Sequence, residues 1–183
     1  MEINKKVYLL LKKEDEDFLF YTKKILCPSE FLKIKDNLYY LSFGFEEESY
    51  EEVFKNLSID FFLSIRTVET EIKLPNDLID DTVSILEGMD EGSYKVEDII
   101  EKAVILGNIK VKTDFKKYYE AKMSKELIET ALIYIKSASL MDAAKSLYIH
   151  RNTLNYRLET IKKITSLDLK SFKSRFAFYG LFK

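Results

Sequence analysis

The sequence is poor in the residues from which many catalytic and metal sites are built: one cysteine, one histidine and five glycines among 183 residues. A single cysteine, Cys27, excludes an internal disulfide and a cysteine-rich zinc site, and it agrees with a reducing cytoplasm. We expect Cys27 to be a small buried apolar residue. The scattered glycines exclude a glycine-rich phosphate loop. One histidine, His150, leaves no pair for a metal and no spare base for a nucleophile.

Long hydrophobic runs are also missing. No stretch reaches the roughly 18 apolar residues of a membrane helix, and the opening MEINKK is not followed by a signal-peptide core of sufficient length. With 46% hydrophobic and 33% charged residues, the chain has the composition of a globular protein with one or two cores. We therefore expect a cytoplasmic protein without a membrane partner.

Charge is distributed unevenly along the chain. Residues 121–183 hold 12 Lys and Arg against 5 Asp and Glu, a net charge of +7, whereas residues 1–120 hold 17 against 26, a net charge of −9. The overall charge of −2 conceals this difference. An acidic part joined to a basic part indicates a nucleic-acid-binding domain carried by a separate partner domain.

Residues 124–165 read as three helices joined by short connections, at 124–137, 139–147 and 151–165. In each, apolar residues recur at intervals of three and four, which places them on one buried face. Small Ala143 and Ala144 in the second helix allow close approach of a neighbour. This pattern is typical of a helix-turn-helix whose last helix enters the DNA major groove. The same pattern also describes any small helical bundle. The polar residues must therefore distinguish a DNA-binding helix-turn-helix from such a bundle.

The outward side chains of the third helix favour DNA. Arg151, Asn152 and Asn155 are of the types that hydrogen-bond base edges. Basic residues are placed for phosphates, His150 at the helix start can satisfy backbone groups or touch a phosphate, and Ser139 could donate to a phosphate. The full set of candidate DNA-binding residues is Ser139, Lys145, His150, Arg151, Asn152, Asn155, Tyr156, Arg157, Lys162 and Lys163, of which Lys145, Arg157, Lys162 and Lys163 are the phosphate candidates.

The string LYIHRNTLNYRLETI at residues 147–161 resembles the C-terminal helix-turn-helix of the PucR/CdaR family of bacterial transcription regulators. The following SLDL at 166–169 and RFA at 175–177 also look like the family's continuation and closing helix. Two residues, Glu159 and Thr160, stand where the family commonly has basic ones, and Met141 replaces a frequent serine, leaving Ser139 as the cap. The resemblance implies a regulator that binds double-stranded DNA and that could respond to an effector of unknown chemistry. Because one recognition helix offers few contacts, we expect specific binding to need a homodimer.

Before this segment the sequence indicates alternating strands and helices. The fold class is therefore α+β: an N-terminal mixed α/β sheet domain at 1–110, acidic and regulatory or dimerising, followed by an all-α helix-turn-helix domain at 111–183. The order of elements resembles the degenerate GGDEF-like domain of CdaR-type regulators. The expected elements are a β-hairpin of strands 7–12 and 18–22, a short helix as one reading near 28–30, strands 38–45 and 59–68, and helices 46–56, 75–86 and 96–107.

No catalytic motif accompanies this resemblance. A GGDEF cyclase needs a Gly-Gly-acid-acid-aromatic turn, and the nearest fragment, GFEE at 44–47, lacks it. The acidic clusters at 14–17, 46–52 and 77–81 favour solvated faces over a cation site. We predict a non-enzyme without cofactor or metal. The alternatives are a protein-interaction module that keeps the helix-turn-helix as a scaffold, favoured by Glu159 and the overall acidity, and a residual nucleotide cyclase.

Overall fold

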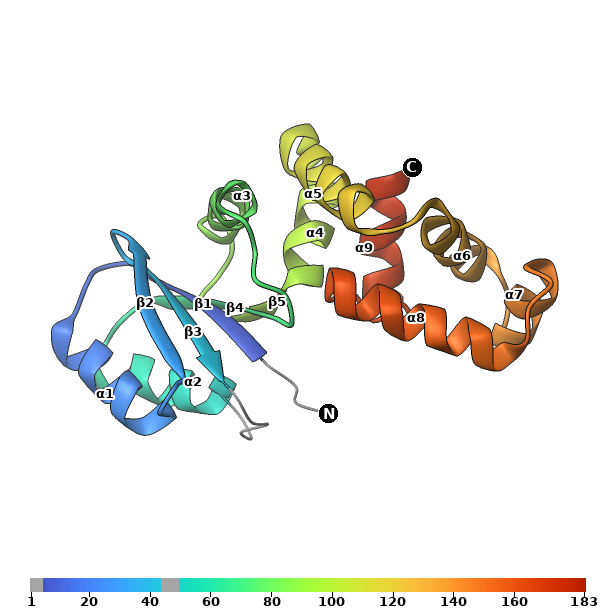
Figure 1. Ribbon diagram of the computed structural model, residues 1–183. Helices are drawn as coiled ribbons and strands as arrows, with labels where there is room; N and C mark the ends of the chain where they lie inside the picture. Colours follow the sequence, from blue (N-terminus) through green and yellow to red (C-terminus); the bar gives the residue numbers. More distant parts are fainter. Residues whose placement is uncertain (1–4, 44–49) are drawn as a thin grey trace. The chain divides into compact units, whose positions relative to one another are not determined.

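The computed structural model describes residues 5–43 and 50–183, which form two compact units (Figure 1). Unit 1 comprises Met1–Lys73 and Val83–Lys95, and unit 2 comprises Leu74–Thr82 and Val96–Lys183. Helix α3 (Asn76–Leu86) contributes its first half to unit 2 and its second half to unit 1. Among the described residues, no helix is both long and apolar enough to cross a membrane.

Unit 1 is built on a five-stranded sheet with the order β2-β3-β1-β4-β5. Neighbouring strands are antiparallel except β4 and β5, which are parallel. At the centre, Leu9 lies opposite Tyr39 on one side and Thr67 on the other. The strands are β1 (Lys5–Leu11), β2 (Glu30–Lys35), β3 (Leu38–Phe43), β4 (Ile65–Thr70) and β5 (Gly92–Lys95).

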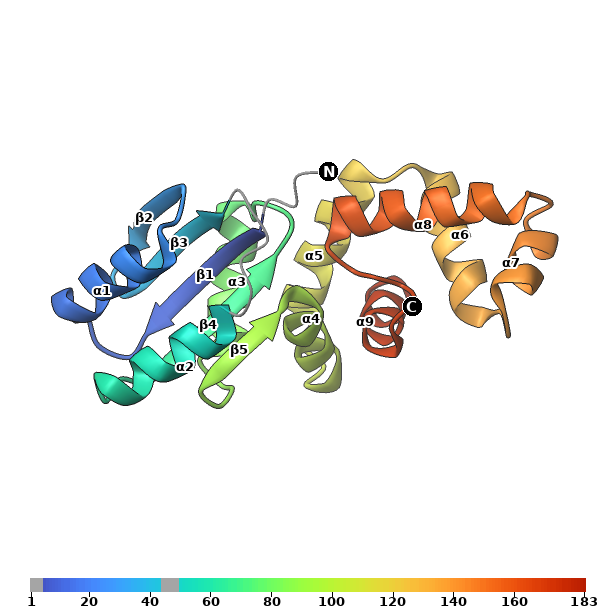
Figure 2. The same cartoon turned by 90° about the horizontal axis from the view of Figure 1, so that it is seen from below.

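Helices α1 (Glu16–Leu26) and α2 (Tyr50–Asp60) lie on one face of this sheet (Figures 1 and 2). Side chains alternate between the two faces of a strand, so every second residue of β1 and β3 meets these helices. The resulting core contains Val7, Leu9, Leu11, Phe18, Leu26, Tyr39, Leu41, Phe43, Tyr50, Phe54, Leu57 and Ile65. The second half of α3 faces the opposite side, where Val83 and Leu10 line a common hollow.

The expected hairpin of strands 7–12 and 18–22 is wrong in its second half, because residues 16–26 form α1. The side chain of Asp15 accepts a hydrogen bond of 2.8 Å from the Phe18 amide and so caps the helix. Phe18, Thr22 and Leu26 are buried at four-residue spacing, the period of a helix. The run FLFYT does not show this helical period in the sequence, because the exposed Phe20 and Tyr21 are apolar like the buried residues beside them.

Cys27 is exposed, contrary to the expectation of a buried residue. It ends α1 in the left-handed region, with φ of 42°, and its thiol donates to the Lys24 carbonyl at 3.2 Å. This position at the helix end turns the side chain out of the core. The alternative of a short helix near 28–30 is also wrong, since β2 begins at Glu30.

The other expected elements are largely present. The strand expected at 38–45 is β3, the helix expected at 46–56 is α2, and those at 75–86 and 96–107 are α3 and α4 (Val96–Ile105). Residues 44–49, including the GFEE fragment, lie outside the described residues. The strand expected from residue 59 begins only at Ile65, because α2 extends to Asp60. Strand β5 had not been expected.

Unit 2 is helical, and contacts between helices that are distant in the sequence hold it together. Helix α4 packs on α5 (Ile109–Lys122) and, more extensively, on α9 (Phe172–Phe182). At this contact a Cβ atom on Gly180 would lie 2.5 Å from a methyl carbon of Val104, so only glycine permits the approach. The contacts thus place α4 in unit 2, whereas the predicted domain boundary lies after residue 110. That boundary stays a prediction about which segment folds by itself.

Candidate DNA-binding site

Three helices with side-chain caps form the expected helix-turn-helix region. Helices α6 (Lys125–Lys136), α7 (Leu140–Ser146) and α8 (Arg151–Thr165) match the predicted bounds to within one residue. Each starts with a side chain that accepts a backbone N–H: Ser124 from Leu127 at 3.2 Å, Ser139 from Asp142 at 3.1 Å, and His150 Nδ1 from Asn152 at 3.2 Å. The predicted capping roles of Ser139 and His150 are therefore confirmed.

The turn between α7 and α8 is fixed by two backbone hydrogen bonds. The Tyr148 amide donates to the Lys145 carbonyl and the Ile149 amide to the Ala144 carbonyl, both at 3.0 Å. This pair is the Schellman arrangement, whose central residue has positive φ and is usually glycine. Here that residue is Tyr148, with φ of 54° and a side chain that is 97% exposed. The sequence thus places a bulky aromatic ring, fully in solvent, at the entry to α8.

Helix α8 has one buried stripe and one outward face. Leu154, Leu158, Ile161 and Thr165 are buried, as predicted. Arg151, Asn152, Tyr156 and Lys163 are exposed, and Asn155 is half-buried. Ala143 and Ala144 of α7 are buried, and α7 packs against α8. The first two turns of α8 therefore present a basic group and two amides to solvent.

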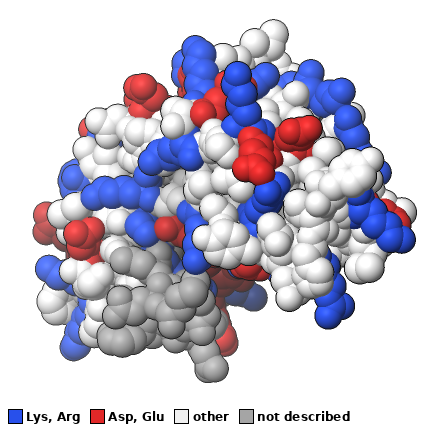
Figure 3. Space-filling view, turned by 45° about the vertical axis from the view of Figure 1, so that its right-hand side comes forward, with Lys and Arg blue, Asp and Glu red and all other residues white. Residues whose placement is uncertain are grey.

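Three cations of this region have no acidic partner within residues 5–43 and 50–183. Lys145, Arg151 and Lys163 form no salt bridge with any residue that the structure describes. Lys145 and Arg151, together with Tyr148 and His150, line an open hollow of about 540 Å³ beside the turn. In the space-filling view, Lys and Arg side chains stand at several separate places, with both uncharged and acidic side chains between them (Figure 3). The unpaired cations around α8 are free to meet an external anion.

Arg157 is turned inward, although we expected it to meet a phosphate. Its side chain is 19% exposed and forms an ion pair with Glu126 of α6. A second bond runs from Arg157 Nη1 to the hydroxyl oxygen of Thr130, at 3.1 Å. Thr130 is fully buried. The guanidinium thus ties α8 to α6 instead of pointing outward.

Other polar groups of the region already have partners. Lys162 pairs with Asp168 at 3.7 Å, and the Ser139 hydroxyl donates to the Asp142 carboxylate at 2.6 Å. Because the carboxylate of Asp142 lies beside Ser139, the local charge opposes a phosphate there. Lys162 and Ser139 are therefore weaker candidates than the unpaired cations.

Glu159, the acidic residue on the outer face of α8, is neutralised locally. Lys170 lies 2.6 Å from its carboxylate, and this hydrogen bond raises the pKa of Lys170 above its usual value. The ion pair with Lys170 offsets the negative charge of Glu159 that favours an interaction module.

Sequence reasoning missed two exposed residues of the region, Tyr148 and Thr153. A turn as short as the one after α7 requires a residue in the left-handed region, which is usually glycine. Because no glycine stands there, the sequence could have indicated that another residue, Tyr148, adopts this conformation. Thr153 lies in the first turn of α8 and is exposed beside Asn152. Within the two described stretches, no group of three or more His, Cys, Asp or Glu residues could hold a metal ion.

Comparison with known proteins places a family segment on these helices. Residues 127–182 match the family model described as the PucR C-terminal helix-turn-helix domain. This segment begins in α6 and ends at α9, so it covers the capped helices, the Tyr148 turn and the outward face of α8.

Three curated relatives are named as regulators, two of them as transcriptional activators. The proline-responsive transcriptional activator PutR of Bacillus subtilis is 44% identical over 57 residues, 31% of this chain and 14% of its own length. The DNA-binding transcriptional activator AdeR of the same organism is 28% identical over 142 residues, 76% of this chain and 30% of its own. The carbohydrate diacid regulator of Escherichia coli is 53% identical over 36 residues, 20% of this chain and 9% of its own.

The chain spans between 9% and 30% of the length of these relatives. A solved structure, the regulator of polyketide synthase expression from Bifidobacterium adolescentis, aligns with a TM-score of 0.49 and 12% identity over 100% of this chain and 80% of its own. Residues 127–182 therefore carry a PucR-like helix-turn-helix, and the relatives that the chain resembles are named as regulators.

Proposed function

We propose that this chain is a sequence-specific DNA-binding transcription regulator of the PucR/CdaR type, with α8 as the recognition helix in the major groove. The observation that carries the proposal is the first turn of α8, where Arg151 and Asn152 are exposed and Arg151 has no partner among the described residues. An arginine can bind guanine bidentately, and an asparagine can bind adenine in the same way. Asn155, one turn further, completes the base-reading set.

Phosphate contacts come from cations on either side of this turn. Lys145 precedes the turn, Lys163 lies on the exposed face of α8, and Lys162 joins them when its bond to Asp168 is exchanged for a phosphate. Tyr156, 74% exposed, packs on the groove wall or a phosphate. His150 and Ser139 act mainly as helix caps. Arg157 is a positioning residue that holds α8 against α6.

A single recognition helix offers few contacts, so we infer binding as a homodimer on two half-sites about one helical turn of DNA apart. The AdeR alignment of 142 residues extends beyond residues 127–182, which supports a regulator with more than the helix-turn-helix in common. That unit 1 is a degenerate GGDEF-like regulatory or dimerisation domain stays a prediction. Analytical ultracentrifugation of the full chain, with and without duplex, tests the dimer.

The decisive experiment is fluorescence anisotropy of the purified chain with a mixed pool of duplex DNA at two salt concentrations. A binder that neutralises about six phosphates as a dimer should show a slope of log K against log salt near −5. Lys163→Ala should reduce this slope by about one per protomer. Lys23→Ala in α1 removes the same charge in unit 1 and should leave the slope unchanged.

Sequence preference is tested separately from affinity. Arg151→Ala and Asn152→Ala should each lower the preference at one base position by about 1 to 3 kcal/mol, as read from selection of binding sites from a random duplex pool. An unchanged preference in both variants would remove the base-reading assignment. No binding at low salt would transfer the function to the interaction-module alternative.

A further inference from the structure

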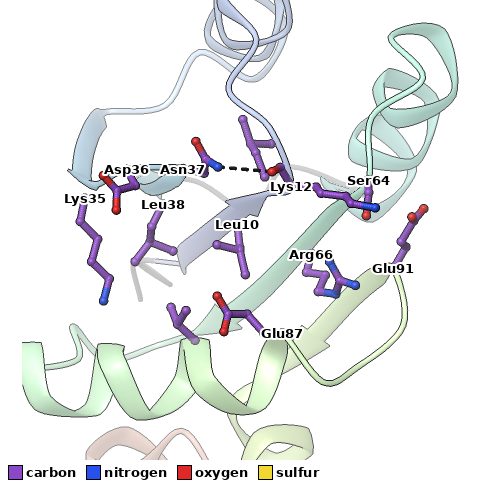
Figure 4. A pocket seen from close by; sticks show the side chains of 12 residues that line it. Leu10, Lys12, Lys35, Asp36, Asn37, Leu38, Ser64, Arg66, Glu87 and Glu91 are labelled. Carbon is purple, nitrogen blue, oxygen red and sulfur yellow. Dashed lines mark hydrogen bonds between the residues drawn. The ribbon is translucent and has the colours of Figure 1, made fainter.

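A second candidate site lies in unit 1, on the face of the sheet opposite α1 and α2. A hollow of about 610 Å³ opens between the ends of β1 and β4, the β2–β3 turn and the second half of α3 (Figure 4). This volume lies within the range of small-molecule sites. The lining comes from four separate segments of the fold, so the hollow is a property of the folded unit and not of one loop.

The floor of the hollow is aliphatic. Leu10 of β1 and Leu38 of β3 share the sheet face that turns towards α3, and Val83 of α3 completes the floor. Such a floor favours an aliphatic group and excludes water from beneath it.

The walls carry both signs of charge. Basic Lys12, Lys35 and Arg66 are matched in number by acidic Asp36, Glu87 and Glu91. An equal lining of this kind opposes a phosphate or a dicarboxylate, because either would meet uncompensated carboxylates. A ligand that is itself neutral overall, with one positive and one negative group, meets no such penalty.

Arg66 and Glu87 stand next to one another around the hollow, beside Leu10 (Figure 4). The Nε of Arg66 donates to the Met89 carbonyl at 2.8 Å, which fixes the guanidinium and leaves its two terminal nitrogens available. Glu87 is exposed and forms no salt bridge or side-chain hydrogen bond with any residue that the structure describes. An acid and a base that face one hollow without pairing leave room for a ligand that satisfies both.

We propose that this hollow binds a zwitterionic α-amino acid with an aliphatic side chain. Arg66 would hold the carboxylate through its terminal nitrogens, since a guanidinium matches a carboxylate bidentately. Glu87 would accept hydrogen bonds from the ammonium group. The side chain would lie on the floor formed by Leu10, Leu38 and Val83. Any regulatory meaning of this binding rests on the proposed DNA-binding function, whereas the binding itself does not.

Isothermal titration calorimetry of the full chain without DNA tests the site. The probes are L-alanine, L-valine, L-leucine, L-isoleucine, L-proline and L-methionine, each titrated to millimolar concentration. For the amino acid that binds best, the analogue without its ammonium group and the analogue without its carboxylate should each bind at least about tenfold more weakly, because each leaves one charged side chain unpaired. No heat of binding from any of the six would overturn the proposal.

Variants locate the binding. Glu87→Gln keeps shape and should weaken binding by about tenfold or more while leaving the melting temperature unchanged, since the Glu87 side chain forms no hydrogen bond or salt bridge with any residue that the structure describes. Arg66→Gln should weaken binding similarly, with folding checked by circular dichroism. Glu16→Gln, an exposed carboxylate on α1 at the other face of the sheet, should bind as the parent does. Equal binding by Glu87→Gln and the parent would place the amino acid elsewhere and refute this site.

Discussion

The hydroxyl of Tyr119 in α5 donates a hydrogen bond of 2.9 Å to the backbone oxygen of Thr165, the last residue of α8. Tyr119 is fully buried. The last carbonyls of a helix have no partner within the helix, so this bond satisfies one of them inside the core. The same bond fixes the C-terminal end of the helix that we propose to read DNA.

Tyr119→Phe should lower the stability of unit 2 by about 1 to 3 kcal/mol, because a buried carbonyl loses its partner while the ring keeps its packing. Urea denaturation followed by circular dichroism measures the change. Tyr118→Phe is the matched control: its ring lies beside that of Tyr119, but it is only half-buried. Equal stability of the two variants would contradict a role for the Tyr119 bond.

Alkaline pH should destabilise the protein through the same residue. Burial raises the pKa of Tyr119 well above its ordinary value of 10. The unfolded chain therefore loses this proton first, so the stability contribution is complete below pH 10 and declines as the pH rises further. Between about pH 9 and 11 the parent should lose stability more steeply than Tyr119→Phe. Burial also raises the pKa of Tyr39 and Tyr40, so only the difference between the two proteins is diagnostic.

Arg157→Ala should reduce stability by about 1 to 2 kcal/mol, in contrast to Arg151→Ala. Most of the loss should come from the bond to buried Thr130, because Glu126 is 67% exposed and an exposed ion pair contributes little. A double-mutant cycle of Arg157→Ala with Glu126→Gln should therefore give a coupling below about 1 kcal/mol. Arg151→Ala should change stability by less than about 0.5 kcal/mol and act on DNA binding alone.

Tyr148→Gly should stabilise the protein. A non-glycine residue in the left-handed region lowers the stability of the folded state by about 1 to 2 kcal/mol. Glycine avoids this strain but lowers stability by about 0.5 to 1 kcal/mol, because it loses more conformational entropy on folding. The expected net gain is about 0.5 to 1 kcal/mol in urea denaturation. Tyr156→Gly, an exposed tyrosine within α8, should have the opposite sign, with a loss of about 1 kcal/mol. Destabilisation by Tyr148→Gly would mean that the ring itself stabilises the turn.

The bounds of α8 were predictable to the residue because its signals are local. Its buried stripe recurs along fifteen consecutive residues and its cap, His150, stands immediately before it. The inward turn of Arg157 was not predictable in this way. Its partners Thr130 and Glu126 lie 27 and 31 residues earlier, so only the packing of α6 on α8 reveals the contact.

Tertiary contacts account for part of the errors in unit 1, and a local helix cap accounts for another. Strand β5 is four residues long and exists through its pairing with β4, which no local pattern records. Residues 18–22 satisfied a strand pattern by composition, and the capping side chain of Asp15 decided for a helix. The hollow beside α3 had no signal in the sequence, since Arg66 and Glu87 come from separate segments that only the fold brings together.

Because α4 packs on α9, the packing of α4 can be completed only after α9 has been synthesised. Lys173 of α9 pairs with Asp98 of α4, 75 residues earlier in the chain. At about 5 to 20 residues per second, a ribosome needs roughly 4 to 15 seconds to add that stretch. Throughout this interval α4, with its buried residues Val96, Ile99, Ile100 and Ala103, lacks the part of its packing that α9 supplies. Nascent unit 2 should therefore expose apolar surface on α4 until α9 has been synthesised, and we expect it to be a substrate for chaperones that shield such surface.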